Sequence, residues 1–349
     1  MPKKNRKSLN KVVLLIISIV FIVVFVRQFG NLSEAIETLA KGNLLFLVAI
    51  FLIQFVGIIN RGGFYYTLYD FFGVKDSVRR LTLLSIASNF LNLAAPAAGL
   101  SGIALFVGEA ERQGMSKSRS ILVNLFAYFL IYAVFVVVLL FGLFYLFFNS
   151  QLYTYQLVTA GILFGMVLVL TVVFFVALKG AARLNKLLTF VVNFINYVLR
   201  IFQANKILIK EGQVHILSSE ISDCLKTIKE KLPDLKLTVL HVFLMEIIDI
   251  LTLYYIFLAF GYPINIGVLI TAYAICMLFS LISITPGGVG VVEATMILML
   301  TNLQVPVELA TIAVIAYRFF TFWLPFFPGY FAFRNLQKQK IIELENGAS

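Results

Sequence analysis

The chain has 349 residues, of which 61% are hydrophobic and 13% are charged, and its formal net charge is +11 at pH 7. Soluble chains carry about 25% charged residues, so the composition excludes a soluble globular domain and predicts a polytopic membrane protein. The basic residues lie in short segments beside apolar runs, which is typical of cytoplasmic membrane-protein loops rather than of a nucleic-acid-binding surface. Since no segment resembles a separate soluble domain, we expect one membrane domain over residues 1–349.

Six apolar runs are long enough, or nearly so, to cross a bilayer as helices, which takes roughly 20 residues. The first follows a basic N-terminal segment without a small-residue cleavage site behind it, so we expect an uncleaved span rather than a signal peptide. Cys224 and Cys276 are expected on opposite sides of the membrane and therefore not in a disulfide. The predicted spans are Val12–Val26, Leu44–Ile59, Ile121–Phe148, Gln156–Leu178, Leu237–Phe260 and Leu309–Phe333.

Two further apolar regions, Leu81–Gly108 and Ile266–Leu300, are interrupted by proline and glycine residues. Unpaired backbone at membrane depth is tolerated only where it is buried in protein or lines a watery cavity. We therefore predict that each region is a re-entrant hairpin of two half-helices, which enters and leaves the membrane on the same side. For the second region, an extramembrane loop between two short helices is the alternative.

The distribution of basic residues supports two re-entrant hairpins and an orientation with both termini in the cytoplasm. If Leu81–Gly108 crossed the membrane once, every later loop would invert, including the strongly basic segment 179–236. The two hairpins would enter from opposite faces, which resembles an inverted pseudo-repeat with a site near the midplane. With Met1 inside, 25 of the 28 lysine and arginine residues fall in the inside segments 1–11, 61–80, 109–120, 179–236 and 334–349.

The segment 183–236 is the longest one without a predicted span. Apolar residues recur in it at helical spacing, and polar residues occupy much of the opposite face. We expect amphipathic helices in the cytoplasmic interface, the second of which covers about Val214–Leu232 and ends at Pro233. A linker that packs the two halves of the protein together is favoured over a regulatory element.

Polar residues at membrane depth are the candidate functional groups, because charges there are costly unless they pair or line a cavity. Glu246 and Asp249 lie three residues apart, on one face of a span, and His241 lies about one turn away. For the charges, the structural alternative is a salt bridge of Arg318 with Glu293 or Asp249. For the first hairpin, the structural alternative is tight helix packing in which the Asn89 and Asn92 amides are hydrogen-bonded locally. The predicted substrate-binding residues are Asn89, Asn92, Pro96, Gly99, Ser101, Gly102, Pro286, Gly287, Gly288, Gly290, Glu293 and Arg318, with Glu246 and Asp249 in support.

The two hairpin tips, Asn89–Gly102 and Pro286–Glu293, are expected to face one another across a polar cavity. Helix N-termini carry partial positive charge, so the half-helices are predicted to hold a lipid phosphate together with Arg318. Glu293 would either neutralise Arg318 when the site is empty or contact a cationic headgroup.

Enzyme signatures are sparse, so we expect a protein that is not an enzyme and uses no metal or other cofactor. His241 and Glu246 are five residues apart and miss the His-Glu-x-x-His zinc pattern, and the chain has no Walker loop for a nucleotide. With two histidines and two cysteines, a conventional zinc site is poorly supplied. Glu109 and Glu111 are expected to be solvated or paired with Arg112.

The signature Pro286-Gly-Gly-Val-Gly-Val-Val-Glu293, followed by Ala316-Tyr-Arg318, Trp323-Leu-Pro325 and Gly329, resembles that of the lysylphosphatidylglycerol synthase transmembrane-region family. The earlier Asn/Pro/Gly segment and Glu111-Arg-Gln-Gly-Met-Ser116 occupy the place of the family's other motif region. The resemblance spans essentially the whole chain. It implies a flippase-like domain in a bacterial or archaeal plasma membrane, with membrane lipids as partners.

In bifunctional members of this family a soluble aminoacyl-transferase domain follows the membrane part, whereas residues 334–349 follow the last predicted span here. We therefore expect a stand-alone membrane domain that moves phospholipid or polyprenyl-phosphate-linked lipid. A non-transporting subunit or partner of a membrane lipid- or glycosyl-transferase is the alternative, and an assembly scaffold is a third class. Ile103-Ala-Leu-Phe106 is apolar where many members carry charged residues, which leaves the substrate's charge open, and a homo-oligomer is left open as well.

Overall fold

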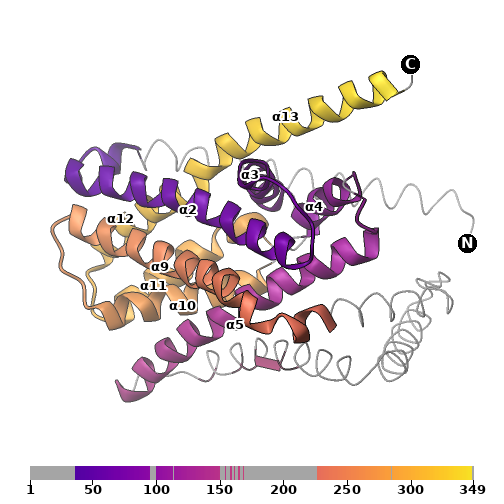
Figure 1. Cartoon of the computed structure of the whole chain (residues 1–349). Helices are drawn as coiled ribbons and strands as arrows, with labels where there is room; N and C mark the ends of the chain where they lie inside the picture. The colour runs from indigo at the N-terminus through magenta and orange to yellow at the C-terminus, as the bar shows by residue number, and fades with distance from the viewer. Residues whose placement is uncertain are drawn as a thin grey trace, which may run out of the picture.

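The computed structural model describes residues 36–94, 100–112, 114–149, 226–283 and 285–347, together with isolated positions between 154 and 168. All regular structure in these residues is helical (Figure 1), which confirms the predicted all-α membrane fold. The predicted spans Val12–Val26 and Gln156–Leu178 lie outside the continuously described ranges, so the total of six spans stays a prediction. Within the described residues, four helices are long and apolar enough to cross a membrane, namely Leu44–Phe71, Arg119–Phe148, Leu232–Ala259 and Val307–Lys338.

Helix α2 (Leu44–Phe71) is longer than the apolar run that predicted it. It begins after Asn43, whose side-chain oxygen accepts a hydrogen bond from the Leu45 N–H at 3.0 Å and caps the helix. The predicted boundary at Ile59 was wrong, because the helix continues through Asn60 and Arg61. One face of α2 carries large exposed apolar side chains, as a lipid-facing surface does: Leu44, Leu45, Val48, Phe51, Leu52, Phe55, Val56 and Ile59.

Helix α9 (Lys236–Ala259) packs along α2, and α5 (Lys117–Phe148) crosses the bundle beside them (Figure 1). Both predicted spans are therefore confirmed to within about one helical turn. Small residues let the helices approach closely. A Cβ at Gly57 would lie 3.1 Å from the side chain of Ile248 in α9, and a Cβ at Gly62 would collide with Thr82.

Each of the two interrupted regions contains two short helices. Helices α3 (Val78–Ala94) and α4 (Leu100–Arg112) flank residues 95–99, which lie outside the described ranges. Helices α10 (Ile266–Ile282) and α11 (Val291–Asn302) flank a break that contains the 3-10 turn η2 (Pro286–Gly288). The two helices of each pair pack against each other. These pairs match the predicted half-helices, and their re-entrant course stays a prediction.

The last predicted span is built from three consecutive elements. These are α12 (Val307–Arg318), the π-helical turn η3 (Phe319–Trp323) and α13 (Leu324–Gly347). Helix α13 packs against α3 and extends beyond the bundle toward the C-terminus (Figure 1). Before α9, Pro233 lies in the short 3-10 turn η1 (Leu232–Leu235), and most of the predicted interfacial segment 183–236 lies outside the described ranges.

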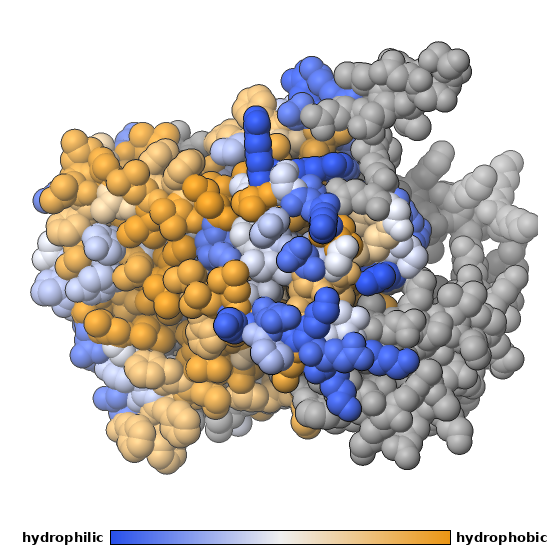
Figure 2. All heavy atoms as spheres, viewed as in Figure 1, coloured by the Kyte–Doolittle hydropathy of each residue, from blue (hydrophilic) through white to orange (hydrophobic). Residues whose placement is uncertain are grey.

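Buried apolar side chains form two clusters. One joins α5, α9, α10, α11 and α12, and the other joins α2, α3, α4, α5 and α9. Apolar side chains also cover much of the visible surface, while hydrophilic ones gather toward the side where α4 lies (Figure 2). An apolar exterior of this kind is what a bundle surrounded by lipid requires.

Candidate functional site

The break between α10 and α11 depends on glycine. Gly287, Gly288 and Gly290 have φ angles of 59°, 67° and 82°, a region that residues with a Cβ enter only with strain. Gly287 is also tightly packed, since a Cβ there would lie 2.7 Å from the ring of Phe322. Position 287 therefore needs glycine both for its backbone conformation and for the space around it.

Glu293 connects this break to the last span. One of its carboxylate oxygens accepts a hydrogen bond from the Gly290 N–H at 2.7 Å, and the other accepts one from the Arg318 Nε–H at 2.7 Å. Arg318 also donates from Nη2 to the Gly287 carbonyl at 3.1 Å, and its guanidinium carbon lies 4.7 Å from the centre of the Phe322 ring. Of the two salt bridges considered for Arg318, the structure contains the one with Glu293. The N-terminus of α11 is thus already capped by a carboxylate.

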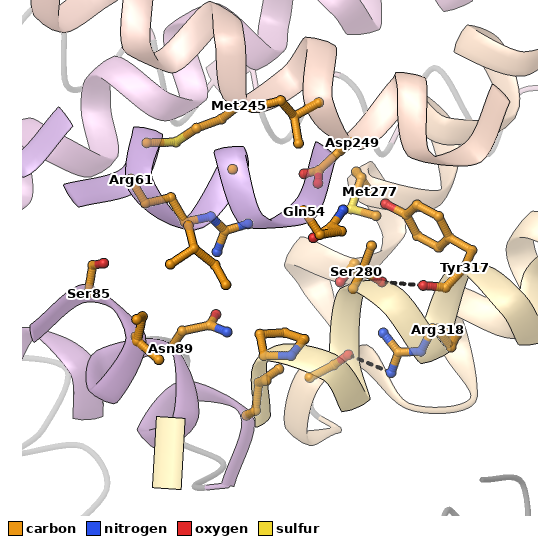
Figure 3. A pocket seen from close by; sticks show the side chains of 18 of the residues that line it. Gln54, Arg61, Ser85, Asn89, Met245, Asp249, Met277, Ser280, Tyr317 and Arg318 are labelled. Atoms are coloured by element: carbon orange, nitrogen blue, oxygen red, sulfur yellow. Dashed lines mark hydrogen bonds between the residues drawn. The ribbon is translucent and has the colours of Figure 1, made fainter. Parts of the chain in front are cut away.

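A cavity of about 250 Å³ lies next to this cluster and is called the central cavity below (Figure 3). Its wall includes residues from 54–61, in the middle of α2, and from 245–249, in the middle of α9. The cavity therefore lies near mid-height of two spanning helices. Its polar lining residues are Gln54, Arg61, Ser85, Asn89, Asp249, Ser280, Tyr317, Arg318 and Thr321.

Several polar side chains in the central cavity have no hydrogen-bond or ion-pair partner among the residues that the structure describes. They are Arg61 of α2, Asn89 of α3, Asp249 of α9 and Tyr317 of α12. Arg61, Asn89 and Asp249 point toward the same space (Figure 3), and Tyr317 is only 1% exposed. Their polar atoms are accessible from the cavity, so these side chains offer donors and acceptors to a molecule inside it.

A second cavity of about 250 Å³ adjoins the central cavity, and Arg61, Asn89 and Asp249 line both. Glu246 lines this second cavity and is 8% exposed, with its Oε2 accepting a hydrogen bond from the Tyr273 hydroxyl at 2.8 Å. The three-residue spacing on α9 thus brings both predicted carboxylates to the same polar space, as expected for one face of a helix.

About half of the predicted site residues meet at these two cavities. Asn89, Gly287, Arg318 and Asp249 line the central cavity, and Asn89, Asn92, Glu246 and Asp249 line the second one. Residues of the two interrupted regions, Asn89 and Gly287, therefore line the same cavity, and the predicted facing of the two hairpin tips stays a prediction.

The other predicted residues have different positions. Gly288, Gly290 and Glu293 shape the break without lining the central cavity, and Pro286 begins its 3-10 turn. The Gly102 N–H donates to the Asn92 side-chain oxygen at 2.8 Å and so orients it. Ser101 lines a separate cavity between α4 and α13, away from the central one. Pro96 and Gly99 lie outside the described residues.

Sequence reasoning missed Arg61 and Tyr317. Arg61 was assigned to a cytoplasmic loop because it follows the apolar run, although it lies within α2. A usable signal was present, since the chain continues after Gly62-Gly63 with the largely aromatic run Phe64–Tyr69 and shows no turn-forming residue before Asp70. Tyr317 lies in the Ala316-Tyr-Arg318 motif of the family signature, but it was not singled out as a site residue because tyrosine is common in apolar helices.

Two other charged or polar residues connect neighbouring helices. Glu109 was expected to be solvated or paired with Arg112, but it is buried and forms an ion pair with Arg80 of α3. His241 Nδ1 lies 2.7 Å from the Asn60 side-chain oxygen, and the Asn60 amide donates to the His241 carbonyl at 2.8 Å. These contacts fasten α4 to α3 and α9 to α2.

The fold and the cavities define a multi-pass α-helical membrane protein with a broken helix beside a buried polar site. Residues 11–329 match the family described as the lysylphosphatidylglycerol synthase TM region, and the chain belongs to this family. A UPF0104 membrane protein of Methanocaldococcus jannaschii is 25% identical over 350 residues, which cover 96% of this chain and 98% of the relative. A UPF0104 membrane protein of Methanothermobacter thermautotrophicus is 32% identical over 82 residues, or 24% of each chain.

Proposed function

We propose that the protein binds headgroups of membrane lipids in its two joined cavities and carries them across the plasma membrane. The observation that supports this proposal is the set of polar side chains in the central cavity, at mid-height of the spans, that have no partner among the described residues. Ionisable groups at this depth are costly, and in membrane proteins they mark substrate pathways by default. Membership of a membrane domain family that is named after a lipid synthase is consistent with a lipid substrate.

The size of the cavities supports a headgroup rather than a whole lipid as the bound part. Sites for complete drug-sized ligands occupy roughly 300–1,000 Å³. Each of the two joined cavities measures about 250 Å³, and together they suit a polar headgroup, whereas a lipid with its acyl or isoprenoid chains is much larger than a drug-sized molecule. The acyl or isoprenoid chains therefore stay in the bilayer while the headgroup passes between α2, α3 and α9. Broken helices beside a midplane site are the construction by which many transporters expose such a site alternately to each side.

The proposed orientation has both termini in the cytoplasm and the two interrupted regions as re-entrant hairpins. The support is the charge distribution, with most lysine and arginine residues in segments on one side. Arg61 is removed from that count, because it lies within α2. The proposed movement is facilitated, without nucleotide hydrolysis.

The test is a flipping assay in proteoliposomes with phospholipids that carry a fluorophore on a short acyl chain, which leaves the headgroup unmodified. Quenching from outside reports how fast the lipids exchange between leaflets. We expect the native protein and Arg79→Gln, which changes an exposed arginine of α3, to accelerate exchange. We expect Arg61→Gln at equal folded amounts to be at least about tenfold slower, because a charge-assisted contact to phosphate is lost.

Exchange no faster than in protein-free vesicles, for anionic, zwitterionic and polyprenyl-phosphate lipids alike, would refute the proposal. In that case the better explanation of the protein's function is that it is a partner subunit of a membrane enzyme or an assembly scaffold. A scaffold predicts that Arg61→Gln changes at most the amount of protein.

A further inference from the structure

We infer that the central cavity is a two-point site for a lipid headgroup, in which Arg61 binds a phosphate and Asp249 binds a hydrogen-bond-donating group of the same headgroup. The donor is an ammonium or a hydroxyl group. The inference rests on the proposed function in taking a lipid as the ligand, and it adds which residues bind it and which headgroup chemistry they select.

The residue that we expect to bind the phosphate is Arg61 rather than Arg318. Arg318 is already engaged by the Glu293 carboxylate and the Gly287 carbonyl, and the N-terminus of α11 is capped by the same carboxylate. The guanidinium of Arg61 has no partner among the described residues and points into the cavity (Figure 3). A guanidinium offers five N–H donors in a planar fork that matches phosphate oxygens, and the unpartnered Asn89 amide lines the same space.

The residue that we expect to bind the donor group of the headgroup is Asp249, which faces the cavity from α9. An ionised carboxylate only accepts hydrogen bonds, and no residue in the described ranges donates one to it. Asp249 and Arg61 line the same cavity, yet they form no ion pair with each other. A guanidinium and a carboxyl group that line one small cavity without forming an ion pair are matched by a ligand that carries both complementary groups.

Tyr317 adds a further polar side chain to the lining of the central cavity. This side chain is 1% exposed, lines the central cavity and has no hydrogen-bond partner in the part of the chain that the structure describes. Because protein surrounds the rest of this side chain, a molecule inside the cavity is expected to supply the hydroxyl with its hydrogen-bond partner.

Two-point binding selects among headgroups. A ligand whose only polar group is a phosphate would satisfy Arg61 and leave the carboxylate of Asp249 unpaired beside another anion, which is unfavourable in a space of low dielectric. The site therefore favours phosphoethanolamine- or phosphoglycerol-type headgroups, and polyprenyl phosphates that carry a sugar, over a bare phosphate ester.

The experiment measures equilibrium binding of three lipids to the purified full-length protein in detergent micelles. Phosphatidylethanolamine and phosphatidylglycerol carry a phosphate and a donor, and phosphatidylmethanol carries a phosphate with no donor. For the native protein we expect the first two lipids to bind at least about tenfold more tightly than phosphatidylmethanol, because a charge-assisted hydrogen bond is at stake. Soluble glycerophosphoethanolamine and inorganic phosphate, tested in parallel, distinguish a lipid site from a site for free headgroups or phosphate.

The two variants are expected to differ in pattern. Asp249→Ala should bring all three lipids to the affinity of phosphatidylmethanol, whereas Arg61→Gln should weaken all three by about tenfold and keep their order. Asp70→Asn, at an exposed position near the end of α2, serves as the matched control and should change nothing. If Asp249→Ala does not fold, Asp249→Asn takes its place, with the loss expected mainly for phosphatidylethanolamine.

Equal binding of the three lipids to the native protein would overturn the inference, as would an Asp249 variant that weakens all of them equally. Binding of the soluble compounds as tight as that of the lipids would overturn it too. Its failure differs from failure of the proposed function. Exchange between leaflets without headgroup selection refutes only the two-point site, whereas selective binding without exchange refutes only the transport.

Discussion

Arg318 Nε lies 2.7 Å from Glu293 Oε1, so that a residue at the end of α12 holds the first turn of α11 in place. The contact combines an ion pair with a helix cap, since the other oxygen of the same carboxylate accepts from the Gly290 N–H. The guanidinium further binds the carbonyl of Gly287. A single arginine thus fixes the whole break between α10 and α11 against the last span.

Breaking this ion pair should destabilise the protein. Arg318→Gln or Glu293→Gln alone is expected to cost about 2–3 kcal/mol, below the range for fully buried pairs, because the Glu293 side chain is 21% exposed. The double variant should cost less than the sum of the two, because neither charge is then left unpaired. Thermal unfolding in detergent measures this, with Arg79→Gln as control, and simple additivity would contradict the coupling.

Gly287→Ala should destabilise the break for two reasons, which a second substitution separates. The positive φ of 59° and the nearby Phe322 ring together are expected to cost about 2–4 kcal/mol. Phe322→Leu should restore the part due to crowding and leave the part due to the backbone. Gly108→Ala, in the exposed part of α4 with open space around it, should be neutral or slightly stabilising by the same unfolding assay.

Tyr273→Phe should reduce stability, because it removes the hydrogen bond to the buried carboxylate of Glu246. The expected cost is about 1–3 kcal/mol, the penalty for leaving a buried polar group without its partner. Glu246→Gln should be far milder, since the amide oxygen can still accept from the tyrosine hydroxyl. Equal losses for the two variants in thermal unfolding would show that the contact does not stabilise α10 against α9.

Tyr317→Phe should behave in the opposite way to Tyr273→Phe. Its hydroxyl has no partner in the described ranges, so the unfolding free energy is expected to change by less than about 0.5 kcal/mol. Binding of phosphatidylethanolamine should nevertheless weaken severalfold, because the ligand loses a hydrogen bond. A stability loss as large as that of Tyr273→Phe would mean that the hydroxyl serves the fold and not the cavity.

The sequence predicted the membrane fold and the broken helices well, for a physical reason. Backbone polar groups at membrane depth must be hydrogen-bonded within the protein. Long apolar runs therefore predict helices, and Pro/Gly interruptions predict breaks in them. The break at Pro286–Glu293 and the intramembrane carboxylates of α9 were located in this way. The Arg318–Glu293 pair was among the alternatives, since two isolated opposite charges at this depth are strongly driven to meet.

Sequence reasoning could not locate what depends on the way helices rotate and pack. Hydropathy ends α2 before Asn60 and Arg61, but the helix continues past them, where Gly62 packs closely against Thr82 and Gly63 against His241. Arg61 becomes a cavity residue only through that continuation. The same holds for Glu109, which meets Arg80 only because α3 and α4 lie side by side.

The π-helical turn Phe319–Trp323 makes the last span a helix with one surplus residue. Tyr317 and Arg318 lie before this turn, and Gly329, which packs closely on Phe90 of α3, lies after it. Removing one residue from the turn would shorten the span by only about 1.5 Å, but it would rotate everything behind it by roughly 100° about the axis. The surplus residue thus sets the rotation of the second half of the span relative to the first. The first half can therefore face the polar cavity while the second half packs against α3.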